Sequence, residues 1–218
     1  MTTTFAGLLL DIGGPMIRLP FEFLDEIEHS YGLAPGTITL RGPFGPGVDR
    51  LWRDRDTGLL SEREYWRLWV EEIGKATQRS CDLGKFFATC YGLLGPEVVR
   101  GEATALAVDA QAAGFRVGAL TNDVSWFLSP ELIPRFSILS ELDAFVDLSH
   151  AEVRKPDPQA YAIALDALGL APGQVLFVDD HPRYVTGAEV AGLPALHFDI
   201  TDAAGSIRRI RDRLGLPA

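Results

Sequence analysis

The feature that most constrains this chain is an alternation, along its second half, of short apolar runs with helical patterns. The apolar runs cover residues 115–120, 145–148, 175–178 and 195–198, and an earlier run of the same kind covers residues 5–10. Strands buried on both faces of a parallel sheet have continuous apolar sequences, and strands that alternate with helices require crossover connections. The chain is therefore predicted to form an α/β fold around a parallel sheet.

Polar residues lie at four of the predicted strand ends. They are Asp11 after 5–10, Thr121 and Asn122 after 115–120, Lys155 beyond 145–148, and Asp179 and Asp180 after 175–178. Because the carboxyl ends of parallel strands meet at one edge of the sheet, we expect these side chains to share one crevice. Carboxylates at close range repel one another without a cation, and a site of oxygen ligands favours Mg²⁺. The sequence therefore predicts a Mg²⁺ site.

Each of these residues also has an ordinary interpretation. Asp11, which is followed by Ile12 and then Gly-Gly-Pro, could form an Asx-turn, and Thr121 could cap the helix that follows it. Lys155 could be a solvated loop lysine. The adjacent Asp179 and Asp180 are harder to dismiss, because two carboxylates at the end of a buried strand need a partner. The order and spacing of the whole set favour a site.

Residues 16–94 show helical patterns and no strand pattern. Helical patterns cover residues 21–31, 48–57, 61–74 and 83–93, and a loop rich in glycine and proline covers 34–47. Ser61 and Glu64 have the spacing of a capping box. We expect an all-helical domain, residues 16–94, inserted into an α/β core of residues 1–15 and 95–218, where a long helix over 96–113 opens the second core segment. The tryptophans of the insertion are expected to pack between helices.

The composition narrows the class of partner. The 218 residues carry a formal net charge of −10, which disfavours nucleic acid and anionic membrane surfaces as partners. Cys81 and Cys90 form no metal-binding pattern, so we expect both to be reduced and buried in a cytoplasmic protein. We expect no secretion signal and no membrane segment. The sequence does not indicate an oligomeric state.

Taken in order, these motifs resemble those of the haloacid dehalogenase-like (HAD) hydrolase superfamily. Asp11 matches the nucleophile of the first motif, Thr121 the hydroxyl of the second, Lys155 the lysine of the third, and Asp179-Asp180 the acidic pair of the fourth. Residues 153–158, 177–180 and 187–192 look like the branch that holds bacterial sugar-phosphate phosphatases and the N-terminal phosphatase domain of epoxide hydrolases. The resemblance implies a Rossmann-like core, with residues 16–94 as a C1-type cap that selects the substrate.

The resemblance also implies roles for the site residues. Asp11 would attack a phosphoryl group to form an aspartyl-phosphate, with Thr121 and Lys155 as its catalytic partners. The phosphate-binding residues would be Gly13, Gly14, Thr121, Asn122 and Lys155. The Mg²⁺ ligands would be Asp11, the carbonyl of Gly13, Asp180 and, through water, Asp179. The predicted function is Mg²⁺-dependent hydrolysis of a small phosphorylated metabolite.

One position departs from the pattern of the superfamily. Most of its phosphatases carry a second aspartate two residues after the nucleophile, as general acid and base, and here that residue is Gly13. Loss of such a proton shuttle slows catalysis on the order of 10²–10⁴-fold. A metal-bound water, a group of the substrate or Asp123 could replace it.

Two other functions stay open on the sequence. A 2-haloacid dehalogenase uses the same nucleophile on carbon and lacks the second aspartate, although the pair Asp179-Asp180 is not typical of it. A phosphate-binding regulatory protein with weak catalysis would also fit Gly13. Substrate choice is expected to depend on insertion residues such as Arg18, Trp52, Arg53 and Trp66. His150 and His181 are given no role, and Arg183 is either a surface residue or a partner of Asp179.

Overall fold

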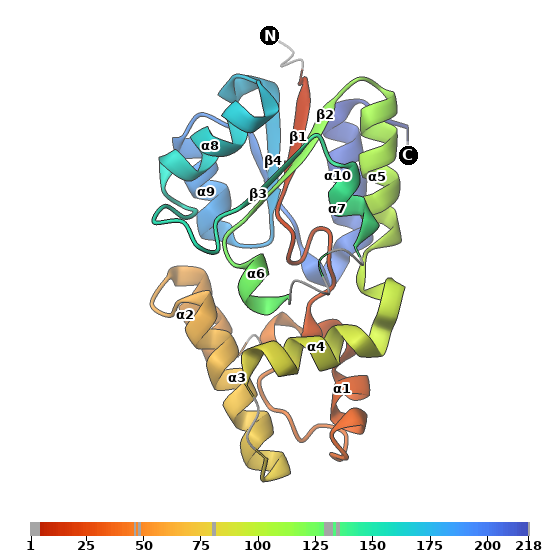
Figure 1. Ribbon diagram of the computed structural model, residues 1–218, viewed down its shortest axis with the longest axis vertical. Helices are drawn as coiled ribbons and strands as arrows, with labels where there is room; N and C mark the ends of the chain where they lie inside the picture. Colours follow the sequence, from red (N-terminus) through yellow and green to blue (C-terminus); the bar gives the residue numbers. More distant parts are fainter. Residues whose placement is uncertain are drawn as a thin grey trace.

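The computed structural model describes residues 5–45, 47, 49–79, 82–128, 133 and 136–217. Five parallel strands form one sheet, helices lie on both of its faces, and a group of helices lies beyond one end of the strands (Figure 1). The predicted α/β fold with a parallel sheet is confirmed.

The sheet has the strand order β3-β2-β1-β4-β5. The strands are β1 (Gly7–Leu10), β2 (Arg116–Thr121), β3 (Ala144–Asp147), β4 (Val175–Asp179) and β5 (Ala195–His197). At the end of the central strand, Leu10 pairs with Ala119 on one side and Val178 on the other. The three middle strands thus end at nearly the same level, so the residues that follow them lie at one edge.

Both faces of the sheet are covered, which explains the continuous apolar strand sequences. Helices α8 (Pro158–Leu168) and α9 (Pro182–Val190) cover one face, and α5 (Gly101–Ala112) and α10 (Ala203–Leu214) cover the other (Figure 1). Leu9 packs in the cluster on the α8 and α9 face, whereas Leu8 and Leu10 pack in the cluster on the opposite face. Successive side chains of β1 therefore point to opposite faces of the sheet and pack into the apolar cluster on each face.

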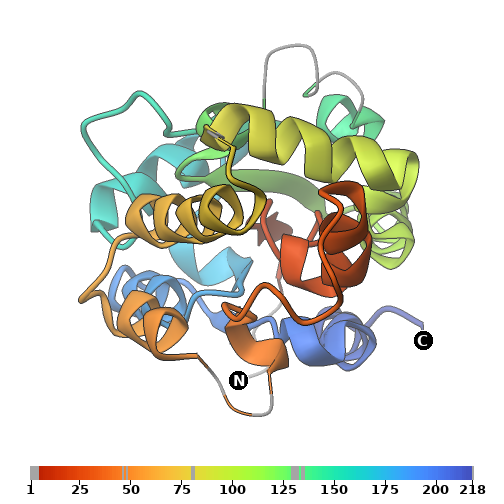
Figure 2. The same ribbon diagram turned by 90° about the horizontal axis from the view of Figure 1, so that it is seen from below.

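The insertion between β1 and α5 is helical. Its elements are a 3-10 turn (Pro20–Phe23), α1 (Leu24–Ser30), a second 3-10 turn (Gly42–Phe44), α2 (Arg50–Thr57), α3 (Glu62–Thr77) and α4 (Leu83–Leu94). They lie beyond the carboxyl ends of the strands (Figures 1 and 2). Phe21, Trp66 and Trp69 pack together, with ring centroids 5.1–5.8 Å apart, so the tryptophans do pack between helices. Ser61 and Glu64 form the predicted capping box.

Some predicted boundaries were wrong. The long helix expected over residues 96–113 is a 3-10 turn (Gly95–Val98) followed, after a break, by α5. The break occurs because the backbone there is hydrogen-bonded to residues 16–18, the segment in which the chain first leaves the core for the insertion. Arg18 N donates to Val98 O, and Arg100 N donates to Met16 O. The helix expected over 21–31 is likewise divided into a 3-10 turn and α1. Val48, expected to begin a helix, lies outside the described residues, and α2 begins at Arg50.

Short elements complete the chain: α6 (Val124–Phe127), α7 (Ser137–Glu141) and two 3-10 turns (Pro172–Gln174 and Ile200–Asp202). Over the described residues, no helix combines the length and the apolar character needed to cross a bilayer. Cys90 is buried, as expected, and Cys81 lies outside the described residues.

Candidate active site

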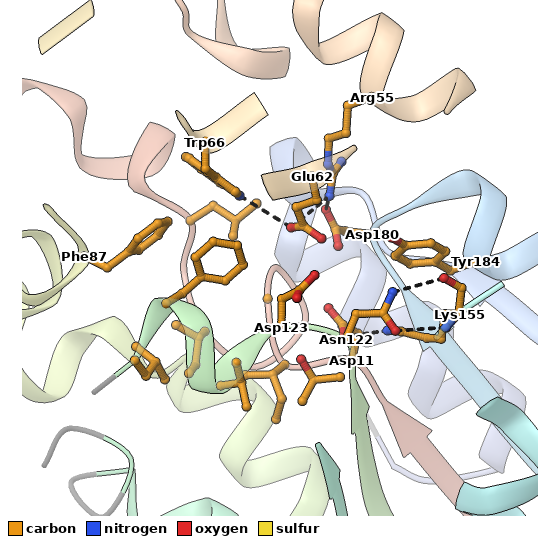
Figure 3. Close-up of a pocket in the computed structure, with 18 of the residues that line it drawn as sticks. Asp11, Arg55, Glu62, Trp66, Phe87, Asn122, Asp123, Lys155, Asp180 and Tyr184 are labelled. Carbon is orange, nitrogen blue, oxygen red and sulfur yellow. Dashed lines mark hydrogen bonds and ion pairs between the residues drawn. The ribbon is translucent and has the colours of Figure 1, made fainter. Parts of the chain in front are cut away.

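Lys155 is the centre of the polar cluster at the carboxyl edge of the sheet. Its Nζ donates to Asp11 Oδ1 at 2.7 Å (Figure 3). It also donates to Asp179 Oδ2 at 2.6 Å and to Leu120 O at 3.0 Å. Although burial alone would lower the pKa of Lys155, the charges of Asp11 and Asp179 raise it above its ordinary value. The lysine is therefore held as an ammonium ion between two carboxylates. In the sequence, Asp11 is 144 positions and Asp179 is 24 positions away from Lys155. The structure brings the three residues together, as the pattern of polar strand ends predicted.

The sheet and one amide side chain position this lysine. Asp11 directly follows β1, and Asp179 is the last residue of β4. Lys155 lies in the loop between β3 and α8, and Asn122, just after β2, fixes that loop. Lys155 N donates to Asn122 Oδ1 at 2.9 Å, and Asn122 Nδ2 donates to Lys155 O at 3.1 Å. Asn122 therefore orients the lysine, and phosphate binding by Asn122 stays a prediction.

Three carboxyl groups lie close enough to hold one metal ion. Oxygens of Asp11, Asp179 and Asp180 all lie within 4.8 Å of one another. Burial raises the pKa of all three carboxyl groups, and the nearby cations lower it without cancelling that effect. Oxygen ligands that are crowded, buried and short of positive charge fit a divalent cation such as Mg²⁺. The residues present therefore suit the predicted ion.

Gly14 has a clear geometric reason to be glycine. Its φ is +81°, and a Cβ placed there would lie 2.9 Å from the Cβ of Asp180 and 3.1 Å from Ile200. The absence of a side chain lets Asp180 approach the loop after β1. Gly13 differs, because a Cβ there would meet only ordinary contacts, 3.6 Å from both Asp11 Oδ2 and Leu19. Thr121 is buried and lines the same cavity as Gly13. Direct phosphate binding by these three residues stays a prediction.

Arg55, which the sequence analysis did not single out, links the insertion to the core. It lies on α2 with only 2% of the side chain exposed, and its Nη2 donates to Asp180 Oδ2 at 3.3 Å. Its guanidinium group also lies 4.3 Å from the ring centre of Trp52. Burial alone would lower the pKa of Arg55, but the charges of Asp180 and Glu62 raise it. Asp180 therefore has a cationic partner that comes from the insertion.

Glu62 is a second residue that the sequence analysis did not assign to the site. It is the first residue of α3 and lines the cavity above Asp11 (Figure 3). Trp66 Nε1 and Arg55 Nη2 lie 3.5 and 3.7 Å from Glu62 Oε1. The capping box at Ser61 was visible in the sequence, and it is the one signal that marks this helix start.

Of the four insertion residues that were expected to influence substrate choice, only Trp66 lines the cavity. Trp66 lines the cavity, while Trp52 is buried under Arg55. Arg53 is exposed, and neither Arg53 nor Arg18 lines the cavity. Part of the cavity wall is apolar. It includes Ile17, Leu19, Trp66, Phe87, Tyr91, Phe127 and Leu128.

The side chains of His150, His181 and Arg183 take no direct part in the polar cluster, although the backbone N–H of His181 donates to Asp179 Oδ1 at 2.8 Å. His150 and Arg183 are exposed, and Arg183 lies against Gly58 rather than at ion-pair distance from Asp179. His181 is buried, with its ring 4.1 Å from that of Tyr184, and its Nδ1 has no hydrogen-bond partner among the described residues. Burial and the charge of Arg55 lower the pKa of His181 to about 2. This imidazole is therefore neutral.

A buried aspartate after the first strand, a lysine that bridges it to a second aspartate, and a helical insertion above them form one polar site at the carboxyl edge of the sheet. The family model of haloacid dehalogenase-like hydrolases matches residues 36–192, more than half of the chain. The chain belongs to this family, as its motifs predicted. The matched range includes Thr121, Lys155, Asp179 and Asp180, and it begins after Asp11.

Several curated relatives of this chain are phosphatases. A phosphatase of Mycobacterium tuberculosis is 31% identical over 112 residues, 50% of this chain and 50% of that protein. The phosphoserine phosphatase of Thermus thermophilus is 27% identical over 166 residues, 76% of this chain and 59% of that protein. The phosphoglycolate phosphatase of Escherichia coli is 29% identical over 86 residues, 39% of this chain and 34% of that protein. The chain spans about half the length of the curated relatives it matches.

Solved structures share the fold at low identity. A dehalogenase crystal structure has a TM-score of 0.63 at 17% identity, covering 97% of this chain and 98% of that one. A HAD-superfamily hydrolase of subfamily IA from Geobacter sulfurreducens has a TM-score of 0.58 at 20% identity, covering 97% of each chain. These similarities establish the fold, and the chain is a HAD-like hydrolase.

Proposed function

We propose that this hydrolase is a Mg²⁺-dependent phosphatase of a small phosphorylated metabolite, with Asp11 as nucleophile. The observation that carries the proposal is the crowding of Asp11, Asp179 and Asp180, whose oxygens lie within 4.8 Å of one another. A divalent cation offsets both this negative charge and that of a phosphate group. The phosphatase names of the curated relatives support the same reaction.

The residues divide the work as follows. Asp11 attacks phosphorus, and the bond from phosphorus to the leaving-group oxygen breaks, giving an aspartyl-phosphate that water hydrolyses. Lys155 offsets the charge of Asp11 and the phosphate, and Thr121 donates a hydrogen bond to a phosphate oxygen. Asp11, Asp179, Asp180 and the carbonyl of Gly13 would hold Mg²⁺, which supplies charge neutralisation. The helical insertion, residues 16–94, works as a cap over this site, and the protein works in the cytoplasm.

The test is phosphate release from p-nitrophenyl phosphate and a panel of sugar phosphates, with Mg²⁺ or with EDTA. The expected result is turnover that needs Mg²⁺ and that Asp11→Asn abolishes. Asp25→Asn, on the exposed face of α1, is the control and should leave turnover unchanged. Equal turnover in Asp11→Asn, or turnover that EDTA does not reduce, would contradict the proposal.

The alternatives give different results in the same assay. A 2-haloacid dehalogenase would release chloride from 2-chloropropionate in EDTA, and the dehalogenase fold of the structural neighbours makes this control necessary. A regulatory phosphate-binding protein would be stabilised by Mg²⁺ with beryllium trifluoride and would turn over no substrate. Three crowded carboxylates favour the phosphatase, because attack on carbon requires no metal ion.

A further inference from the structure

The core half of the cavity offers little for proton transfer. Position 13 is glycine, and Asp11 and Asp179 are both bound to Lys155. A group that protonates the departing oxygen must be able to lie next to that oxygen rather than next to the attacking carboxylate. The proton donor must therefore come from elsewhere in the cavity.

Asp123, which the sequence analysis considered as a replacement for the missing proton shuttle, is held in place by two arginines. Its Oδ1 accepts from Arg63 Nε at 2.7 Å and from Arg154 Nη1 at 2.7 Å. Both guanidinium groups also donate to Ser149 O, at 3.2 and 3.0 Å. Moving Asp123 toward a substrate would break charge-assisted hydrogen bonds on both sides. Asp123 therefore acts as the anchor of Arg63, a residue of the insertion, on the core.

Glu62 is held by longer contacts than Asp123 is. Its contacts with Arg55 and Trp66, at 3.7 and 3.5 Å, are long and both involve Oε1. Among the described residues, Oε2 has no hydrogen-bond or ion-pair partner. Its side chain is 21% exposed, so a ligand in the cavity can reach it. The carboxyl group therefore lies in the cavity with one oxygen available.

The surroundings of Glu62 favour a carboxyl group that can hold a proton. Burial raises the pKa of Glu62, the charge of Arg55 lowers it, and the charges of Asp123 and Asp11 raise it again. A carboxyl group whose pKa is raised toward the working pH transfers protons most effectively. Its place is also fixed, because the capping box of Ser61 and Glu64 sets where α3 begins.

We infer that Glu62 supplies the proton shuttle that Gly13 lacks; the inference rests on the proposed phosphatase function. As Asp11 attacks and the bond to the leaving-group oxygen breaks, the Glu62 carboxyl gives its proton to that oxygen and the alcohol departs. The Glu62 carboxylate then takes a proton from water as the water oxygen attacks phosphorus. The bond from phosphorus to Asp11 breaks, which releases phosphate and restores Asp11 and the protonated Glu62.

The test compares leaving groups in Glu62→Gln. For alkyl phosphates, whose alkoxide needs a proton, kcat/KM should fall on the order of 10²-fold. For p-nitrophenyl phosphate, whose phenolate leaves without one, kcat/KM should change by less than about fivefold. Glu71→Gln, an exposed change on the same helix, is the control and should change neither. Mg²⁺ with beryllium trifluoride should raise the Tm of Glu62→Gln and of the unsubstituted protein equally, which shows an intact pocket.

A second substitution makes the test reciprocal. Gly13→Asp fits the loop, since a Cβ there meets only ordinary contacts at 3.6 Å. Added to Glu62→Gln, Gly13→Asp should raise kcat/KM for alkyl phosphates at least about tenfold. In the protein with Glu62 intact, the same substitution should change this kcat/KM much less. An equal loss of kcat/KM for both substrate classes, or no loss, would overturn the role of Glu62 while leaving the phosphatase proposal standing. If the unsubstituted protein shows no turnover that depends on Asp11, both proposals fail.

Discussion

The two halves of the cavity are built differently. In the core half, the two ion pairs of Lys155 are 2.6 and 2.7 Å long. Asp11 follows β1 and Asp179 ends β4, while Asn122 fixes the loop of Lys155. In the insertion half, Arg55 reaches Asp180 at 3.3 Å and Glu62 at 3.7 Å, whereas Arg63 is anchored to Asp123 of the core at 2.7 Å. Short charge-assisted contacts on a rigid frame fix groups for chemistry. The longer contacts of Arg55 and Glu62 leave these two side chains of the insertion half free to adapt to a substrate.

The largest effect is expected from removing the cation of the core half. Lys155→Met leaves Asp11 and Asp179 buried without their partner, so the free energy of unfolding in EDTA should fall by about 3–5 kcal/mol. Urea denaturation measures it, and Lys75→Met, an exposed change on α3, is the control. Added Mg²⁺ should recover part of the loss, because the carboxylates then share a cation. A loss no larger than that of Lys75→Met would contradict the contrast between the halves.

The core half could be predicted from sequence because its positions follow from a simple rule. Asp11 and Asp179 each end an apolar run, and parallel strands place such residues at one edge whatever the details of packing. The position of Lys155 does not follow from this rule alone, because Lys155 lies in a loop after β3. Its place depends on the two hydrogen bonds with Asn122, which no periodicity indicates.

The insertion half could not be predicted in this way. Helical periodicity identified α2 and α3, but the direction in which a helix points at a distant site depends on tertiary packing. Trp52 and Trp66 looked alike in sequence, yet one is buried under Arg55 and the other lines the cavity. The sequence therefore suggested Arg53, whereas the arginines whose side chains reach the core are Arg55, two residues further along α2, and Arg63 on α3.

A smaller effect is expected at the insertion half. Arg55→Met removes the partner of Asp180, and the longer contact predicts a loss of about 2 kcal/mol in unfolding free energy in EDTA. Mg²⁺ should recover most of this loss, because Asp180 is then held from the core side. Arg53→Met, two residues away and exposed, is the matched control. If Arg55→Met destabilises the protein as much as Lys155→Met does, the two halves are equally rigid and the contrast is wrong.

The smallest effect concerns His181, which lies between the two halves beside Asp180. In the folded protein its pKa is lowered from 6.5 to about 2, whereas in the unfolded chain it is ordinary. Between these values the unfolded state binds the extra proton, so this residue makes stability fall as the pH falls below 6.5. His181→Gln should remove that contribution, about 1 kcal/mol between pH 7.5 and pH 5.5. Urea denaturation at both pH values measures it, with exposed His150→Gln as control. If His181→Gln keeps the full pH dependence, the imidazole gains a proton in the folded state and is not shielded by the insertion.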